Sequence, residues 1–286
     1  MTQNNELSSA WQEWIISNSQ RGCSVKSMIE AMVNAQFEAT FAKQCIEKFM
    51  AIDIASLPTT KTDEPYRYEP SRIASGNTIA LADKSVHVAL RLSHPEVVLF
   101  NHFMSDDECD ALIALAKDKT LSPSTVVDST SGKGEVITAR SSEGTYFQRG
   151  ENTLVQSLER RISQLMNFPI ENGEGIQVLH YLPGAEYRPH FDYFPKHDAG
   201  SARHLNLGGQ RIATLVMYLN DVENGGETFF PEANLSVTPK KGSAVYFSYF
   251  NSLGQTDSAT LHAGNPVLAG EKWIATKWVR QTKYGS

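Results

Sequence analysis

The sequence has few cysteines and no surplus of basic residues. Its three cysteines, Cys23, Cys45 and Cys109, are widely separated and form no CxxC pair, which argues against a zinc knuckle and a disulfide framework. The formal net charge is −6 over 286 residues, whereas a protein that binds the phosphate backbone usually carries a basic surplus. We therefore expect reduced cysteines in structural positions and no nucleic-acid partner.

The sequence also lacks long apolar runs. None approaches the roughly 18 residues that a membrane-spanning helix needs. The first residues, Met-Thr-Gln-Asn-Asn-Glu, are polar and lack the basic and apolar regions of a secretory leader. These features predict a cytoplasmic protein with no membrane contact. Hydrophobic residues make up 41% of the chain, which is enough for an ordinary globular core.

Three apolar sets with helical spacing occupy residues 6–55. The sets are Trp11, Trp14, Ile15 and Ile16; Val25, Met28, Ile29, Met32 and Val33; and Phe37, Phe41, Cys45, Ile46 and Phe49. They predict a small helical unit over residues 1–57. This unit is either a bundle packed on the main domain or a docking module for a partner or substrate, and both interpretations stay open.

Residues 58–92 are predicted to form a linker with leading strands, and residues 93–286 the main domain. A capping box at Ser105-Asp-Asp-Glu108 predicts the start of a helix, and a second helix is expected near residues 152–166. A mobile polar loop is expected over residues 118–138.

After Pro169 the pattern changes from helices to strands. The expected strands cover residues 175–182, 211–219, 242–249 and 272–280. Two helices followed by a run of strands predict an α+β fold, with helices covering one face of a mostly antiparallel sheet.

Three residues of metal-ligand type are His190 and Asp192, in His-Phe-Asp, and His262, in Leu-His-Ala-Gly. In a strand, His190 and Asp192 would share a face while Phe191 and Tyr193 point away. Two histidines and one carboxylate leave three octahedral positions open, as in non-haem Fe(II) oxygenases. Mn(II) and Zn(II) accept the same ligand types.

Other histidines are weaker candidates for this site. His197 and His204 lie in a polar loop, which preorganises metal ligands poorly, and they remain rivals. His180 alternates out of phase with Tyr181, so we interpret it as structural.

Lys272 follows His262 by ten residues, and we expect both on one hairpin. On its strand Lys272 would share a face with Ile274, Thr276 and Trp278. A buried lysine facing a metal pocket needs an anion. 2-Oxoglutarate could supply this anion and also bind the metal. Its keto-acid end would chelate the metal while its distal carboxylate pairs with Lys272. The presence of Lys272 as a partner for such a keto acid favours iron over zinc as the metal.

With these residues the chain resembles the prolyl 4-hydroxylase branch of the Fe(II)/2-oxoglutarate-dependent dioxygenases, over about residues 95–280. Four motifs in order carry the resemblance: Gln177-Val-Leu-His-Tyr-Leu-Pro-Gly-Ala-Glu-Tyr-Arg-Pro-His-Phe-Asp192; Gly209-Gln-Arg-Ile-Ala-Thr-Leu-Val-Met-Tyr-Leu219; Gly225-Gly-Glu-Thr-Phe-Phe-Pro231; and Leu261-His-Ala-Gly-Asn-Pro-Val267 with Gly270-Glu-Lys-Trp-Ile-Ala-Thr-Lys-Trp278. The resemblance implies a double-stranded β-helix, or jelly roll, with supporting helices. The N-terminal helical unit lies outside it.

The resemblance also implies three groups of site residues. The Fe(II) ligands would be His190, Asp192 and His262. The residues that hold the 2-oxoglutarate carboxylate would be Tyr181, Thr228 and Lys272. The catalytic candidates near the metal and substrate would be Tyr187, Arg211 and Trp278. Loops over residues 122–142 and 195–210 would close over the substrate.

The expected enzyme is a hydroxylase of a C–H bond in a prolyl residue of a peptide or protein, using Fe(II), 2-oxoglutarate and O2. Asp192 favours hydroxylation, because halogenating relatives lack this carboxylate. The sequence leaves open whether ascorbate is required. One alternative is a hydroxylase of a free amino or imino acid, for which a compact pocket would be expected in place of an open groove. A remote alternative is a non-catalytic binding protein on the same fold.

Overall fold

The structure is a computed structural model that describes residues 7–20, 23, 25–35, 37–54, 65–128, 131–136, 139–195 and 198–285. Three helices come first: α1 (Ser9–Gln20), α2 (Val25–Asn34) and α3 (Ala39–Ile54). Three more follow among the strands: α4 (Asp106–Lys117), α5 (Thr153–Met166) and the short α6 (Ser201–Leu205). No helix within these ranges is long and apolar enough to cross a membrane.

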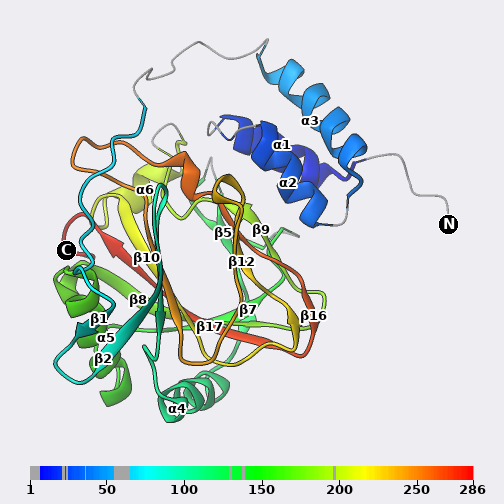
Figure 1. The fold of residues 1–286 in the computed structure, drawn as a ribbon. Coiled ribbons are helices and arrows are strands. Elements are labelled where there is room, and N and C mark those ends of the chain that lie inside the picture. Colours follow the sequence, from blue (N-terminus) through cyan, green and yellow to red (C-terminus); the bar gives the residue numbers. More distant parts are fainter. Residues whose placement is uncertain are drawn as a thin grey trace.

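Two antiparallel sheets form a jelly-roll barrel (Figure 1). The larger sheet contains, in spatial order, β1 (Thr78–Ala80), β2 (Ser85–Ser93), β3 (Glu96–Asn101), β14 (Ala244–Ser248), β10 (Arg211–Tyr218), β17 (Lys272–Arg280), β8 (Gly173–Tyr181), β7 (Glu143–Phe147) and β4 (Ser122–Pro123). The smaller contains β13 (Leu235–Val237), β12 (Thr228–Phe230), β15 (His262–Gly264) and β9 (Tyr187–His190). Two short pairs complete the fold, β11 (Asn224–Gly225) with β16 (Val267–Ala269) and β5 (Val126–Val127) with β6 (Gly134–Glu135).

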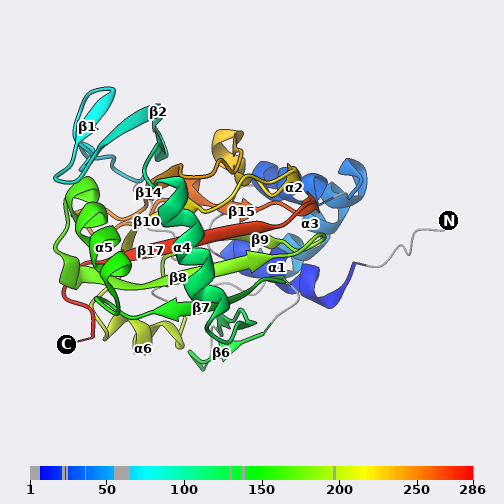
Figure 2. The ribbon, with the colours of Figure 1, turned by 90° about the horizontal axis from the view of Figure 1, so that it is seen from below.

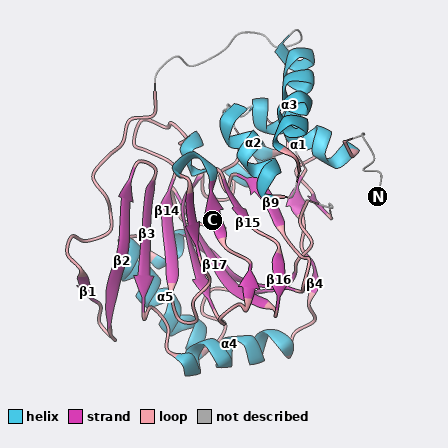
Figure 3. Cartoon of the chain, turned by 45° about the vertical axis from the view of Figure 1, so that its right-hand side comes forward, coloured by secondary structure: helices cyan, strands magenta, loops and turns pink. Residues whose placement is uncertain are grey.

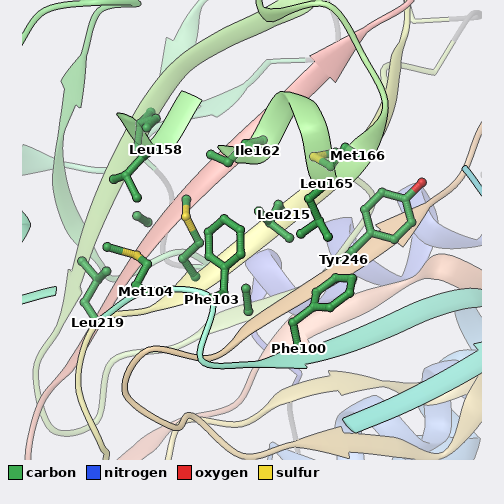
Figure 4. Packing of buried hydrophobic residues seen from close by; sticks show 14 of the residues in the cluster. Phe100, Phe103, Met104, Leu158, Ile162, Leu165, Met166, Leu215, Leu219 and Tyr246 are labelled. Atoms are coloured by element: carbon green, nitrogen blue, oxygen red, sulfur yellow. The ribbon is translucent and has the colours of Figure 1, made fainter. Parts of the chain in front are cut away.

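Helices α4 and α5 cover the outer face of the larger sheet (Figure 2). The predicted capping box starts α4, because Ser105 Oγ accepts from Glu108 N and Glu108 Oε2 accepts from Ser105 N. From α5, Leu158, Ile162 and Leu165 pack into the core against the sheet (Figure 4). Burying each such side chain stabilises the fold by about 1.5–3 kcal/mol. This packing anchors α5 on the outer face of the larger sheet.

A second apolar core lies on the inner face of the larger sheet. The inward residues alternate with the outward ones: Leu179 and Tyr181 of β8 and Val216 and Tyr218 of β10 belong to this inner core. The same cluster includes Trp11, Trp14, Ile15, Met28, Met32 and Ile46 of the N-terminal helices. The helical unit therefore shares its core with the barrel, and Figure 3 shows it beside β9 and β15.

The four long predicted strands are confirmed as β8, β10, β14 and β17, and the two predicted helices as α4 and α5. The expected loop over residues 118–138 instead contains the short strands β4, β5 and β6, with residues 129, 130, 137 and 138 outside the described part. Two members of the second apolar set, Val25 and Val33, are exposed. The predicted boundary after residue 57 also lies outside the described residues.

Two further expectations about strands are wrong. Strand β9 ends at His190, so Asp192 lies in the bend that follows it, and Phe191 and Tyr193 are buried in the inner core. His262 and Lys272 do not share a hairpin, because β15 pairs with β12 and β9 whereas β17 pairs with β10 and β8. The two residues therefore lie in different sheets. This could not be seen from the local sequence, because the strands pair with partners that are far away in the chain.

Candidate metal and co-substrate site

His190, Asp192 and His262 converge on one point inside the barrel. His190 and His262 are direct cross-strand partners on β9 and β15, which brings their rings together at a centroid distance of 4.3 Å. Asp192 follows β9, and its Oδ1 lies 3.7 Å from His190 Nε2 while its Oδ2 lies 3.7 Å from His262 Nε2. Asp192 and His262 are buried, and His190 is mostly buried.

Backbone carbonyls orient both imidazoles. His190 Nδ1 lies 2.8 Å from Arg188 O, and His262 Nδ1 lies 3.0 Å from Thr260 O. Because a carbonyl oxygen only accepts, each Nδ1 carries the proton in these contacts and each Nε2 keeps a free lone pair. Metal-binding histidines are usually held in this way.

Asp192 is ready to act as an anionic ligand. Burial opposes its ionisation, but the nearby His262, His190 and Arg211 outweigh that effect and lower the pKa of the carboxyl below its ordinary value. Thr214 on β10 donates its Oγ1 hydrogen to Asp192 Oδ2 at 2.6 Å. Burial, together with His262, lowers the pKa of His190 well below its usual range, which leaves a neutral imidazole suited to a metal.

The donor set fits a divalent metal. The three ligand atoms all lie within 4.8 Å of one another. Two atoms that each lie about 2.1 Å from one ion can be at most about 4.2 Å apart, and both His–Asp separations of 3.7 Å meet this limit. Two imidazoles and one carboxylate without thiolate match the facial arrangement of non-haem Fe(II) sites.

Lys272 lies on the inner face of β17, where it pairs with Tyr181 of β8. Its side chain is 2% exposed, and no carboxylate among the described residues forms an ion pair with it. Burial, partly offset by Glu227, lowers the pKa of Lys272 to about 8. Gly226, at φ +71°, and Gly264 leave space for this side chain, because a Cβ on Gly226 would lie 3.3 Å from Lys272 Cδ. The structure therefore holds a buried cation open to an anion.

Tyr181 and Thr228 surround Lys272. Tyr181 is its direct cross-strand partner on β8, and Lys272 Nζ lies 5.2 Å from the centre of the tyrosine ring. Thr228 on β12 pairs with Gly264, next to the Lys272 ammonium. Tyr218 donates its hydroxyl hydrogen to Thr228 Oγ1 at 2.7 Å. The three predicted co-substrate residues thus lie together, with Tyr218 as an additional support.

The three predicted catalytic residues lie on two sides of the metal ligands. The Tyr187 ring stacks on His190 at a centroid distance of 3.5 Å. Trp278 lies under the Arg211 guanidinium, 3.9 Å from ring centre to Cζ. Arg211 is bound by Glu174 through Nε at 2.6 Å and Nη2 at 3.0 Å, and its Nη1 donates to Asp192 O. Arg211 therefore contacts the metal-ligand segment directly.

Sequence reasoning missed Arg140, a buried cation beside the site. Its guanidinium lies 4.6 Å from the centre of the Tyr187 ring, and its Nη2 donates to Gln177 Oε1. Arg140 Nε is buried without a hydrogen-bond partner. Glu174, which also accepts from Arg280 Nε at 2.6 Å, was missed as well. No local pattern marks either residue, because each joins the site only through pairing between strands.

The remaining histidines behave differently from the three ligands. His180 bridges Glu143 and Glu271 through its two ring nitrogens and stacks on Trp273, which agrees with a structural role. His204 Nε2 contacts Gly132 O at 2.8 Å and takes no part in the ligand cluster. His197 lies outside the described residues.

Comparisons with known proteins agree with this geometry. A model of the 2OG-Fe(II) oxygenase superfamily matches residues 176–280. The chain is 40% identical over 209 residues to probable prolyl 4-hydroxylase 3 of Arabidopsis thaliana, covering 66% of this chain and 71% of that protein. It is 42% identical over 203 residues to prolyl 4-hydroxylase 5 of the same plant, covering 64% and 68%.

A solved structure is also similar. It is a viral collagen prolyl hydroxylase from Paramecium Bursaria Chlorella virus-1 in complex with 2-oxoglutarate. The identity is 34% and the TM-score 0.52, over 64% of this chain and 95% of that chain.

Proposed function

The chain belongs to the 2OG-Fe(II) oxygenase superfamily, and we propose that it hydroxylates prolyl residues in a peptide or protein. One observation carries the proposal: the histidines and carboxylate of a facial metal site lie in one barrel with an unpaired buried lysine. The substrate class comes from relatives that are prolyl 4-hydroxylases at about 40% identity.

In this mechanism His190 and His262 would hold Fe(II) through Nε2, and Asp192 would hold it through a carboxylate oxygen. Lys272 pairs with the distal carboxylate of 2-oxoglutarate, and the Tyr181 and Thr228 hydroxyls donate hydrogen bonds to it. Fe(II) held at this site would supply, together with 2-oxoglutarate and O2, the chemistry that oxidises an unactivated C–H bond. The net change is oxidation of the substrate to an alcohol while 2-oxoglutarate and O2 yield succinate and CO2.

Side chains around the metal position the substrate and exclude water. Tyr187 stacked on His190 and Trp278 under Arg211 form apolar walls. Arg140 is placed to donate a hydrogen bond, because its buried Nε has no protein acceptor. A peptide carbonyl is a suitable acceptor, because it hydrogen-bonds a guanidinium without adding a second buried charge.

Two loops are proposed to close over the substrate. They cover residues 122–142 and 195–210, and they already contact each other where His204 Nε2 meets Gly132 O. A Cβ on Gly200 would clash with the carbonyl oxygen of Asp128, so the backbones of the two loops are in contact. This contact is the observation that favours the second candidate, hydroxylation of a free amino or imino acid, for which a compact pocket is expected.

Finer features are proposed with the same function. The N-terminal helical unit would help to dock the substrate, as its position beside β9 and β15 suggests. Introducing a charge on its exposed face with Val33→Glu should then raise the KM for a peptide without changing the KM for 2-oxoglutarate. Cys23, Cys45 and Cys109 are buried and form no disulfide, which supports a reducing, cytoplasmic location. Ascorbate is proposed as an auxiliary reductant. Neither nucleic acid nor a membrane is proposed as a partner.

The test is succinate formation from 2-oxoglutarate with Fe(II) and O2, with and without ascorbate. Proline-containing peptides are compared with free proline and pipecolate. His190→Ala should abolish turnover, and His87→Ala, an exposed histidine on β2, should not. Peptide-stimulated turnover supports the proposal, whereas stimulation by free imino acids alone assigns the enzyme to small-molecule chemistry. Wild-type succinate no higher than that of His190→Ala would leave only a non-catalytic binding protein.

A further inference from the structure

The two residues that precede the metal ligand His190 are attached to helix α1. Trp14 donates its Nε1 hydrogen to Pro189 O at 2.7 Å, in a buried contact between residues 175 positions apart. The guanidinium of Arg188 lies 4.5 Å from the centre of the Trp11 ring. Trp11 and Trp14 are one helical turn apart, so they contact consecutive residues of β9 from the same face of α1.

Strand β9 is short and lies at the edge of the smaller sheet. It is four residues long, and within the described residues it pairs with β15 on one side and with Arg140 through an isolated bridge at Tyr187 on the other. The register between β9 and β15 shifts after His262. Arg188 N also donates to Ala139 O. Because Arg188 O orients the imidazole of His190, movement of this backbone would turn the ligand away from Asp192 and His262.

The second histidine is held differently. His262 is oriented by Thr260 O, and Thr260 belongs to a short turn that starts at Asp257. Asp257 Oδ1 accepts from Ala259 N, and Asp257 O accepts from Thr260 Oγ1. The orientation of His262 is thus stabilised within its own segment, whereas the backbone that orients His190 is held by residues far away in the sequence, among them Trp14 of α1.

Helix α1 is itself held by aromatic contacts within the helical unit. The Trp11 ring contacts Trp14 and Phe37, both at 5.0 Å in edge-on geometry, and Phe37 stacks on Phe41 of α3 at 6.1 Å. Such pairs favour one relative orientation of the rings. The tryptophans are therefore fixed where they contact Arg188 and Pro189, and Figure 3 shows α1 beside β9.

We propose that α1 is a positioning element for the metal site, in which Trp14, with Trp11 beside it, holds Arg188 and Pro189 so that His190 Nε2 points at the metal. The helical unit would then raise metal affinity without supplying a ligand. This goes beyond the proposed reaction, and it does not depend on which substrate is hydroxylated.

The test measures the affinity of the full-length apoprotein for Mn(II) by calorimetry with 2-oxoglutarate present and no substrate. Trp14→Phe keeps an aromatic ring but removes the Nε1 donor, and it should raise the Kd about five- to tenfold. Trp11→Phe weakens the stacking with Arg188 and should raise the Kd about two- to threefold. This second variant keeps the proposal testable if Trp14→Phe does not fold.

The matched control is Ile46→Val, a buried residue of α3 in the same helical unit. It should lower the melting temperature but leave the Kd for Mn(II) within about twofold. Wild-type affinity in Trp14→Phe would overturn the proposal. Equal losses of affinity in Trp14→Phe and Ile46→Val would overturn it too, because they would indicate general loosening. Since no turnover is measured, the result stands apart from the outcome of the hydroxylation assay.

Discussion

Strand β17 places one buried lysine on each face of the larger sheet, and the two faces treat that charge differently. Lys277, 3% exposed, faces the outer helices, where its Nζ pairs with Glu159 of α5 at 2.7 Å. Lys272, 2% exposed, faces the interior and has no ion pair within the described ranges. Burial lowers the pKa of both lysines.

The difference distinguishes structural charge from functional charge. A buried ion is costly unless it is paired, and the outer core follows this rule with Lys277 and Glu159. The inner core departs from this rule, because Lys272 is buried there without an ion pair among the described residues. Departures of this kind are expected where a site is kept ready for a ligand. We therefore propose that the outer face serves stability and that the inner face serves binding.

The largest effect is expected from breaking the outer pair. Lys277→Met would leave Glu159 buried with only the hydrogen bond from Gly150 N, and the free energy of unfolding should fall by about 3–5 kcal/mol. Chemical denaturation would measure this loss. The double variant Glu159→Gln/Lys277→Met should recover much of it, since no uncompensated charge remains. Wild-type stability in the Lys277→Met variant would show that Glu159 can stay buried without its ion-pair partner at no cost.

The matching change on the inner face should affect binding instead. Lys272→Met removes the proposed partner of the 2-oxoglutarate carboxylate, so the Kd for 2-oxoglutarate should rise about 100-fold, or roughly 2.7 kcal/mol. The apoprotein should be as stable as the wild type or more so, because a costly buried charge is gone. Calorimetry with 2-oxoglutarate and denaturation of the same sample would test both statements. Unchanged affinity would contradict the role of Lys272.

A pH titration should sharpen the contrast for Lys272. Its folded pKa of about 8 lies below the ordinary value of about 10.4, so the folded apoprotein binds fewer protons than the unfolded chain between these values. Its contribution to stability therefore rises from about pH 8 to about pH 10. Since the anion needs the charged lysine, the Kd for 2-oxoglutarate should increase about tenfold per pH unit above 8. The contribution of Lys272 is obtained by subtracting the pH dependence of the Lys272→Met variant from that of the wild type. If the two proteins showed the same pH dependence, Lys272 would not be the titrating group.

The smallest effect is expected from the support behind Thr228. Tyr218→Phe removes the hydrogen bond to Thr228 Oγ1 and should cost about 1 kcal/mol, equivalent to a rise of roughly fivefold in the Kd for 2-oxoglutarate. Metal affinity should not change, because Tyr218 contacts none of the three ligands in the described contacts. Tyr146→Phe, the same substitution at an exposed position of β7, is the control. An equal loss of 2-oxoglutarate affinity in both variants would show that Tyr218 does not support the co-substrate site.

Much of the fold could be predicted from the sequence where elements are long. Strands β8, β10, β14 and β17 and helices α4 and α5 span enough residues for the side-chain period to emerge. Strands β12, β13 and β15 have three residues each, which is too few for a period. The sequence did not predict the bend that carries Asp192, because β9 ends at His190 and the strand pattern does not continue to Asp192.

The sequence by itself determined the ligand chemistry of the site: two imidazoles, a carboxylate and a lysine, in an order that resembles one enzyme family. Tertiary structure decided which buried lysine is paired, how Arg140 and Glu174 join the site, and that α1 contacts the strand of His190. Periodicity and capping act over a few residues and are legible in the chain. Cross-strand pairing and helix docking join residues far apart in sequence, so only the folded arrangement specifies them.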